Sequence, residues 1–97
     1  MSRLKSPAEE LLGSRGRIRV LKVLAESGDL NISEVSRRSG LNYTSVERHL
    51  TKLKELGLVK EKRYGKIRIF TTLFHTLTIR FEKGGETTMD IQRNPPA

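Results

Sequence analysis

The chain has 97 residues and a mass of 11.0 kDa, which is enough for one small domain with a modest core. Hydrophobic residues make up 35% and charged residues 31%, a balance too polar for a membrane protein and too apolar for a chain disordered throughout. The 19 lysines and arginines outnumber the 11 acidic residues, and the resulting charge of +8 favours a polyanionic partner such as nucleic acid.

What the chain lacks argues against several classes of function. It has no cysteine, which excludes a disulfide framework, a thiolate zinc site and a cysteine nucleophile. Neither His49 nor His75 has a second ligand at metal-binding spacing, so we expect no metal and no other cofactor. There is no nucleophile elbow, phosphate-binding glycine loop or pair of carboxylates in an apolar setting, so we do not expect an enzyme.

The sequence also gives no sign of a membrane or secretory role. Its apolar runs are broken by charge and fall far below the ~20 residues needed to cross a bilayer. The basic start, residues 1–5, lacks the apolar stretch of a signal peptide. We therefore expect a cytoplasmic protein that does not contact a membrane.

Two helices are predicted in the first third of the chain. Ser6 and Glu9 form a capping box that opens a short helix to Leu12, so residues 1–13 read as an arm and a short helix. Ser14 caps a second helix over residues 15–27, which Gly28 ends. Its apolar stripe at helical spacing comprises Ile18, Leu21 and Leu24 or Ala25, widened by Val20 and Val23.

Two further helices follow, joined by a tight turn. After an extended stretch over residues 30–32, Ser33 is expected to cap a brief helix over residues 34–39 that ends at Gly40. Leu41 is an apolar plug, and Asn42 caps a longer helix over residues 43–56 that Gly57 closes. The apolar face of this helix carries Val46, Leu50, Leu53 and Leu56.

The remaining residues favour strands. Residues 58–63 and 66–71 predict a β-hairpin around Tyr64 and Gly65, with Val59, Ile67 and Ile69 facing the core. Residues 72–92 fit either a helix or a second β-hairpin, because the apolar spacing is helical from 70 to 81 and alternating from 77 to 81. Four threonines between residues 71 and 81 favour strands, and residues 93–97 form a frayed tail.

The order of these elements resembles a known family. Residues 32–50, ISEVSRRSGLNYTSVERHL, look like a helix-turn-helix, in which Val35 and Val46 bridge the helices and Gly40 supplies the turn. With the hairpin added, residues 14–71 resemble the winged helix-turn-helix repressors, especially archaeal, ArsR-like or MarR-like regulators. The resemblance implies an α+β fold with a three-helix core and a β-hairpin wing, followed by a C-terminal hairpin or helix.

The resemblance implies a site on double-stranded DNA. The helix over residues 43–56 would enter the major groove, where Arg48 could grip guanine, and the wing would follow the backbone or minor groove. Glu47 reads as a solvated charge of that helix, and Asn42 as a cap. The residues expected to contact DNA are Arg37, Arg38, Tyr43, Thr44, Ser45, Arg48, Lys52, Lys62, Arg63, Tyr64, Lys66 and Arg68.

We therefore predict a transcription regulator that binds DNA at the nucleoid and acts as a homodimer, since one winged helix covers only one half-site. The dimer surface is expected among Leu4, Leu11, Leu12 and residues 73–91. The alternative is an architectural, chromatin-type protein with little sequence preference. The metal-sensing chemistry of some ArsR-like proteins is not expected here, because the ligands are missing.

Overall fold

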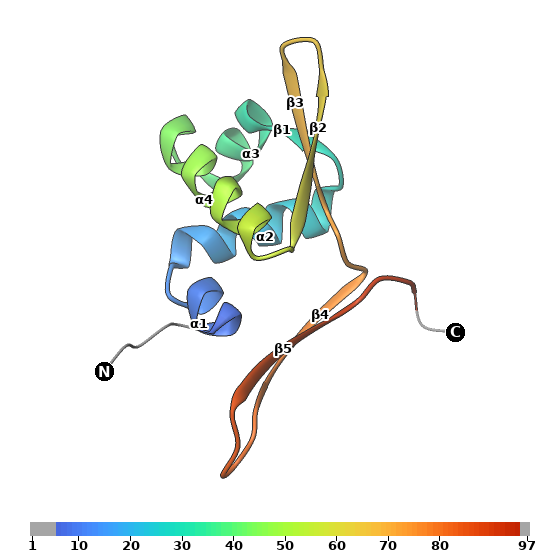
Figure 1. Cartoon of the computed structure of the whole chain (residues 1–97). Coiled ribbons are helices and arrows are strands. Elements are labelled where there is room, and N and C mark those ends of the chain that lie inside the picture. The colour runs from blue at the N-terminus through green and yellow to red at the C-terminus, as the bar shows by residue number, and fades with distance from the viewer. Residues whose placement is uncertain (1–5, 96–97) are drawn as a thin grey trace.

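The computed structural model describes residues 6–95 and has the predicted α+β architecture (Figure 1). The predicted arm at residues 1–5, with Leu4, and the last two residues of the predicted tail lie outside this range. The elements in chain order are α1 (Pro7–Leu12), α2 (Arg15–Ser27), β1 (Leu30–Asn31), α3 (Ile32–Ser39), α4 (Tyr43–Glu55), β2 (Val59–Tyr64), β3 (Ile67–Thr72), β4 (Thr76–Phe81) and β5 (Thr87–Gln92).

The helices begin where short polar side chains satisfy their first free amides. Ser6, Ser14 and Asn42 cap α1, α2 and α4, and the capping box of α1 is present, as predicted. The predicted cap of α3 is wrong: Asn31 occupies that position, and its Oδ1 accepts from the Glu34 amide at 2.8 Å. The helix therefore starts at Ile32, which is buried in the core.

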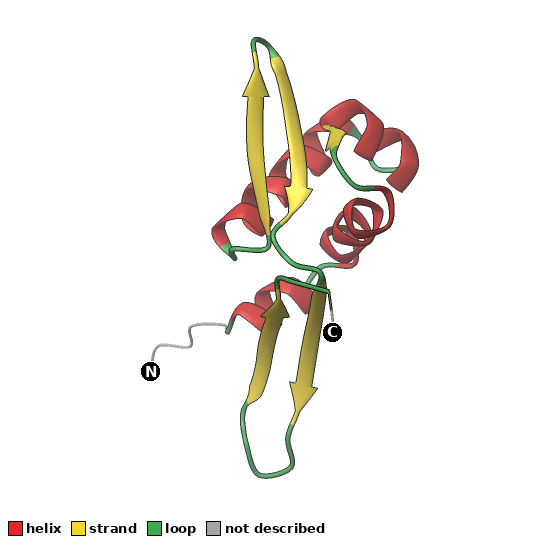
Figure 2. Ribbon diagram, turned by 90° about the vertical axis from the view of Figure 1, so that its right-hand side faces the viewer, coloured by secondary structure: helices red, strands yellow, loops and turns green. Residues whose placement is uncertain are grey.

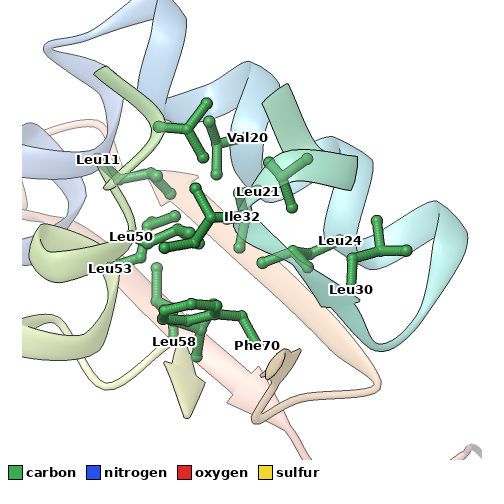
Figure 3. Close-up of a cluster of buried hydrophobic side chains, with 13 residues drawn as sticks. Leu11, Val20, Leu21, Leu24, Leu30, Ile32, Leu50, Leu53, Leu58 and Phe70 are labelled. Carbon is green, nitrogen blue, oxygen red and sulfur yellow. The ribbon is translucent and has the colours of Figure 1, made fainter. Parts of the chain in front are cut away.

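The core lies where the helices meet the sheet (Figure 3). The predicted apolar face of α4 is confirmed for Val46, Leu50 and Leu53, which are fully buried. The predicted stripe of α2 is partly wrong, because Val20, Leu21 and Leu24 are buried whereas Ile18 is 38% exposed and Ala25 is exposed. The reason is that α2 packs on both α3 and α4, which turns the Val20 side of the helix inward.

The wing is a hairpin whose base belongs to the core. Strands β1, β3 and β2 form an antiparallel sheet in that order, and the loop between β2 and β3 is Gly65-Lys66, with Gly65 at φ +62°. Phe70 in β3 is fully buried. Ile67 was expected to face the core but is 54% exposed, because strand alternation puts it on the opposite face of β3 from the buried Phe70.

The segment over residues 76–92 is a second antiparallel hairpin, so the strand interpretation holds and the helical one is wrong. Leu77 pairs with Ile91 and Ile79 with Met89, so four apolar side chains share one face and pack against the core. Strand β5 contacts α1. Both views place this hairpin and α1 at the opposite end of the molecule from the wing tip (Figures 1 and 2).

Candidate nucleic-acid interface

The outer face of α4 is polar along its length. The buried face of the helix anchors it through Val46, Leu50 and Leu53, and Asn42 Oδ1 accepts from the Ser45 amide at 2.8 Å. The opposite face borders a shallow depression of about 540 Å³. Three of the predicted DNA-contacting residues, Thr44, Arg48 and Lys52, line it together with Arg17, Glu47, Thr51 and Glu55.

A smaller polar hollow joins the start of α4 to the wing. Its volume is about 180 Å³, and its lining includes Tyr43, Lys66, Arg68 and Ser33 at the start of α3. Tyr43 and Lys66 are exposed, whereas Arg68 is only partly accessible. The hollow therefore connects the two elements that the sequence assigned to the major groove and to the backbone.

The wing tip carries the remaining predicted residues. Lys62, Arg63 and Tyr64 are exposed, and Tyr64 is 62% accessible. Alternation along the hairpin separates them: Arg63 shares a face with Glu61 and Arg68, while Lys62 and Tyr64 lie on the other face. The tip thus presents cations and one aromatic ring on two faces, at the opposite end of the molecule from the hairpin of β4 and β5 (Figure 1).

A compact ion network joins the wing to α4. Arg68 Nε donates to Glu61 Oε2 at 2.7 Å, and Arg68 Nη1 donates to Glu47 Oε2 at 2.5 Å. Lys54 Nζ donates to Glu61 Oε1 at 2.8 Å, and Arg63 Nε donates to Glu61 Oε2 at 3.0 Å. The guanidinium of Arg68 also lies 5.4 Å from the ring centre of the buried Phe70.

Glu61 is the acceptor at the centre of this network, and only 6% of its side chain is exposed. The hydrogen bonds from Arg68 and Lys54 lower the pKa of Glu61 to about 2. The same contacts with Glu61 and Glu47 raise the pKa of Arg68 above its ordinary value. Glu61 and Arg68 are therefore both charged at neutral pH.

Three other predicted cations also have carboxylate partners. Arg37 and Arg38 lie in the last turn of α3, and both donate to Glu34, at 2.7 and 3.2 Å. Hydrogen bonds from Arg37 and Arg38 lower the pKa of Glu34. Lys52 Nζ lies 3.2 Å from Glu55 and 3.9 Å from Glu10.

Fewer cations of α4 and the wing are free of a carboxylate partner than the sequence suggested. Among the described cations of α4 and the wing, four make no ion pair with a carboxylate: Arg48, Lys60, Lys62 and Lys66. These are the side chains free to bind phosphate or base edges without first losing a partner.

His49 packs between α4 and α2. Its side chain is 7% exposed, and a Cβ placed on Gly16 of α2 would lie 2.7 Å from its Nε2. Burial, with smaller contributions from Arg17 and Arg48, lowers its pKa. His49 is thus a packing residue in the contact between these two helices. Within residues 6–95, no group of three His, Asp or Glu side chains is arranged to hold a metal.

Sequence reasoning missed the roles of Glu47, Lys54 and Glu61. It interpreted Glu47 as a solvated helix charge and assigned no role to Glu61 or Lys54. The predicted turn at Tyr64 and Gly65 is wrong by one residue, and the observed loop at Gly65-Lys66 places Glu61 opposite Phe70 and Arg63 opposite Arg68. The pairing with α4 carried no signal, since it depends on how the hairpin leans on the helix.

The arrangement of these elements defines a winged helix-turn-helix protein, and comparisons with solved structures support this class. A possible transcriptional regulatory protein from Mycobacterium bovis is similar, with 26% identity over 68% of this chain and 70% of that chain, and a TM-score of 0.61. Reduced HlyU from Vibrio cholerae has 26% identity over 68% and 72% of the two chains, with a TM-score of 0.58.

A third similar structure is a homodimeric winged helix-turn-helix DNA-binding domain from M. bovis, from a possible ArsR-family transcriptional regulator. It has 22% identity over 74% of this chain and 75% of that chain, with a TM-score of 0.58. A comparison with curated protein sequences gave no significant match. No helix within the described residues is long and apolar enough to span a membrane.

The family comparison makes the class more specific. The family described as "Bacterial regulatory protein, arsR family" matches residues 14–61, from the cap of α2 into β2. The chain therefore carries a helix-turn-helix domain of the ArsR family and is a DNA-binding transcription regulator of the winged helix-turn-helix class. The family is one of regulatory proteins rather than enzymes.

Proposed function

We propose that the protein reads double-stranded DNA with α4 in the major groove. The observation that carries this proposal is the polar outer face of α4, on which Arg48 has no carboxylate partner among residues 6–95 while the opposite face anchors the helix in the core. The major groove admits one helix, and a bidentate arginine is the commonest reader of guanine. Tyr43, Thr44 and Ser45, in the first turn of α4, lie where such helices approach base edges.

The wing provides the backbone contacts in this proposal. Lys62 and Lys66 flank the tip and pair with no carboxylate in the described part of the chain, so both can neutralise phosphate, and Tyr64 can stack on sugar. Arg37, Arg38 and Lys52 can reach phosphates only by leaving Glu34, Glu55 or Glu10, so we assign them a weaker contribution. Binding to chromosomal DNA would place the protein at the nucleoid, in the cytoplasm.

The protein acts as a homodimer in this proposal. An apolar groove of about 490 Å³ runs between α1, α2 and β4, and its lining includes Leu12, Ile18 and Ile79. The apolar face of β4 continues past this groove to Phe81, which is 74% exposed. A second copy would cover both features, and the similar M. bovis domain is homodimeric. In domain terms, residues 14–71 read DNA, and residues 72–92 with α1 form the dimer element.

Binding to duplex DNA at several salt concentrations tests the main proposal. The three unpaired wing lysines of each protomer, Lys60, Lys62 and Lys66, with the weaker contribution of Arg37, Arg38 and Lys52, give about eight phosphate contacts in a dimer, so log K should fall with log salt at a slope of roughly −7. Genome-wide mapping of bound sites would then separate a regulator from an architectural protein, because only a regulator gives a shared sequence at the bound sites. Absence of binding at low salt, or binding independent of salt, would refute the proposal.

Sedimentation analysis of Phe81→Ser and Ile18→Glu tests the dimer. Both side chains lie outside the fully buried core, so these variants should remain folded. We expect both to shift the protein toward the monomer, and we expect the exposed Tyr64→Ser at the wing tip to leave the association unchanged. A dimer that persists in both variants would show that the interface lies elsewhere.

A further inference from the structure

The ion network between α4 and the wing has the geometry of a brace. Glu47 and Lys54 are seven residues apart on α4, so they lie on the same side of the helix, separated by two turns or about 10 Å. Each contacts a different strand: Glu47 bonds to Arg68 of β3, and Lys54 bonds to Glu61 of β2. Two attachment points on a helix fix both the distance and the angle of the hairpin.

The brace is also connected to the core. Arg68 bonds to Glu61 across the hairpin through its Nε, with a second and longer contact from Nη2 at 3.4 Å. Its guanidinium lies over Phe70, which is fully buried at the base of the wing. Only 23% of the Arg68 side chain is exposed, against 67% for the neighbouring Arg63. Arg68 thus contacts Glu61, Glu47 and the ring of Phe70, and most of its side chain is shielded from solvent.

We propose that Glu47 and Arg68 are positioning residues, which set the angle between the wing and the recognition helix so that both reach the same DNA segment. This inference rests on the proposed function of α4 and the wing, and it assigns a role within that function. Glu47 lies on the helix face that would meet DNA, where an unpaired carboxylate would repel phosphate. Its pairing with Arg68 accounts for an acidic residue at that position.

Glu47→Gln gives a test in which the possible roles predict different results. If Glu47 is a solvated charge, removing it should strengthen binding to all DNA sequences. If it orients the wing, binding should weaken about three- to tenfold, because the amide holds the guanidinium less well and the wing contacts are no longer aligned. Glu55→Gln is the matched control, since Glu55 lies on the same helix but, within the described residues, forms its ion pair with Lys52 and not with the wing; it should leave binding unchanged or slightly stronger.

Arg68→Lys provides the complementary measurement. Lysine keeps the positive charge but cannot bond to Glu61 and Glu47 together, because it lacks the planar fork of arginine. A phosphate-binding role predicts nearly unchanged affinity and salt slope, whereas the positioning role predicts a loss similar to that of Glu47→Gln. The double variant Glu47→Gln/Arg68→Lys should then bind about as well as either single variant, because both changes break the same link. Additive losses would refute the coupling.

A measurement without DNA separates this inference from the proposed function. Residual dipolar couplings of the amides in residues 62–66 report the orientation and mobility of the wing relative to α4. We expect Glu47→Gln and Arg68→Lys to change or reduce these couplings, while Glu55→Gln leaves them as in the wild type. Unchanged couplings in both variants would refute the brace even if the protein binds DNA. Failure of the wild type to bind DNA would refute the proposed function and leave the brace to be judged by the couplings.

Discussion

Replacing Gly16 with alanine tests how closely α2 packs on α4. Two effects oppose each other at this position. Alanine favours a helix over glycine by roughly 0.5–1 kcal/mol, which would stabilise the protein. The added Cβ, however, would lie 2.7 Å from Nε2 of His49, closer than van der Waals contact allows. His49 is 7% exposed, so its ring has little room to move away.

The steric effect should outweigh the helix propensity. Adding a methyl group to a packed interface typically costs about 1–3 kcal/mol. Subtracting the gain in propensity leaves a net destabilisation of about 1 kcal/mol for Gly16→Ala. In a domain of this size that corresponds to a fall in Tm of roughly 4–8 °C. Thermal unfolding followed by circular dichroism, at a fixed protein concentration, measures the difference.

The His49→Ala background provides the decisive comparison. Removing the ring removes the clash, so Gly16→Ala should then stabilise the protein by about 0.5–1 kcal/mol, through helix propensity alone. The effect of one substitution thus changes sign according to whether His49 is present. A rise in Tm for Gly16→Ala in the wild-type background would show that the ring yields freely and that the two helices are not in close contact there.

Three further predictions concern DNA binding, the helix cap and the ion network. Arg48→Ala should reduce the free energy of binding to the preferred DNA sequence by about 1–3 kcal/mol and weaken sequence preference. Lys62→Ala should instead weaken binding to all sequences alike and reduce the salt slope by about 0.9 per protomer. Identical behaviour of the two variants would contradict their separate roles. Asn42→Ala should lower the free energy of unfolding, measured in urea, by about 1 kcal/mol, and Asn42→Asp should lower it by much less. Equal losses in the two variants would argue against the capping role of Asn42. Because the pKa of Glu61 falls from 4.5 to about 2 on folding, its contribution is complete above pH 4.5 and lost as the pH falls toward 2. The stability difference between the wild type and Glu61→Gln should therefore shrink over that range, and a constant difference would refute the assignment.

The sequence alone determined most of the local structure. Short polar caps and glycine stops predicted the bounds of α1, α2 and α4 closely, because capping depends on residues within one turn of the helix end. The apolar spacing of α4 predicted its buried face, because residues that recur every three or four positions lie on one side of a helix. The cap of α3 was misplaced because Asn31 and Ser33 are both good caps, and the choice between them depends on the burial of Ile32.

Only the tertiary structure decided which cations are free and which are paired. The charges of Arg68, Glu61 and Glu47 are evident in the sequence, but their pairing depends on the angle at which the hairpin meets α4. The same is true of the close contact between Gly16 and His49, which arises from the crossing of two helices distant in sequence. Local rules place side chains along an element and on its faces, whereas packing between elements decides which charges meet.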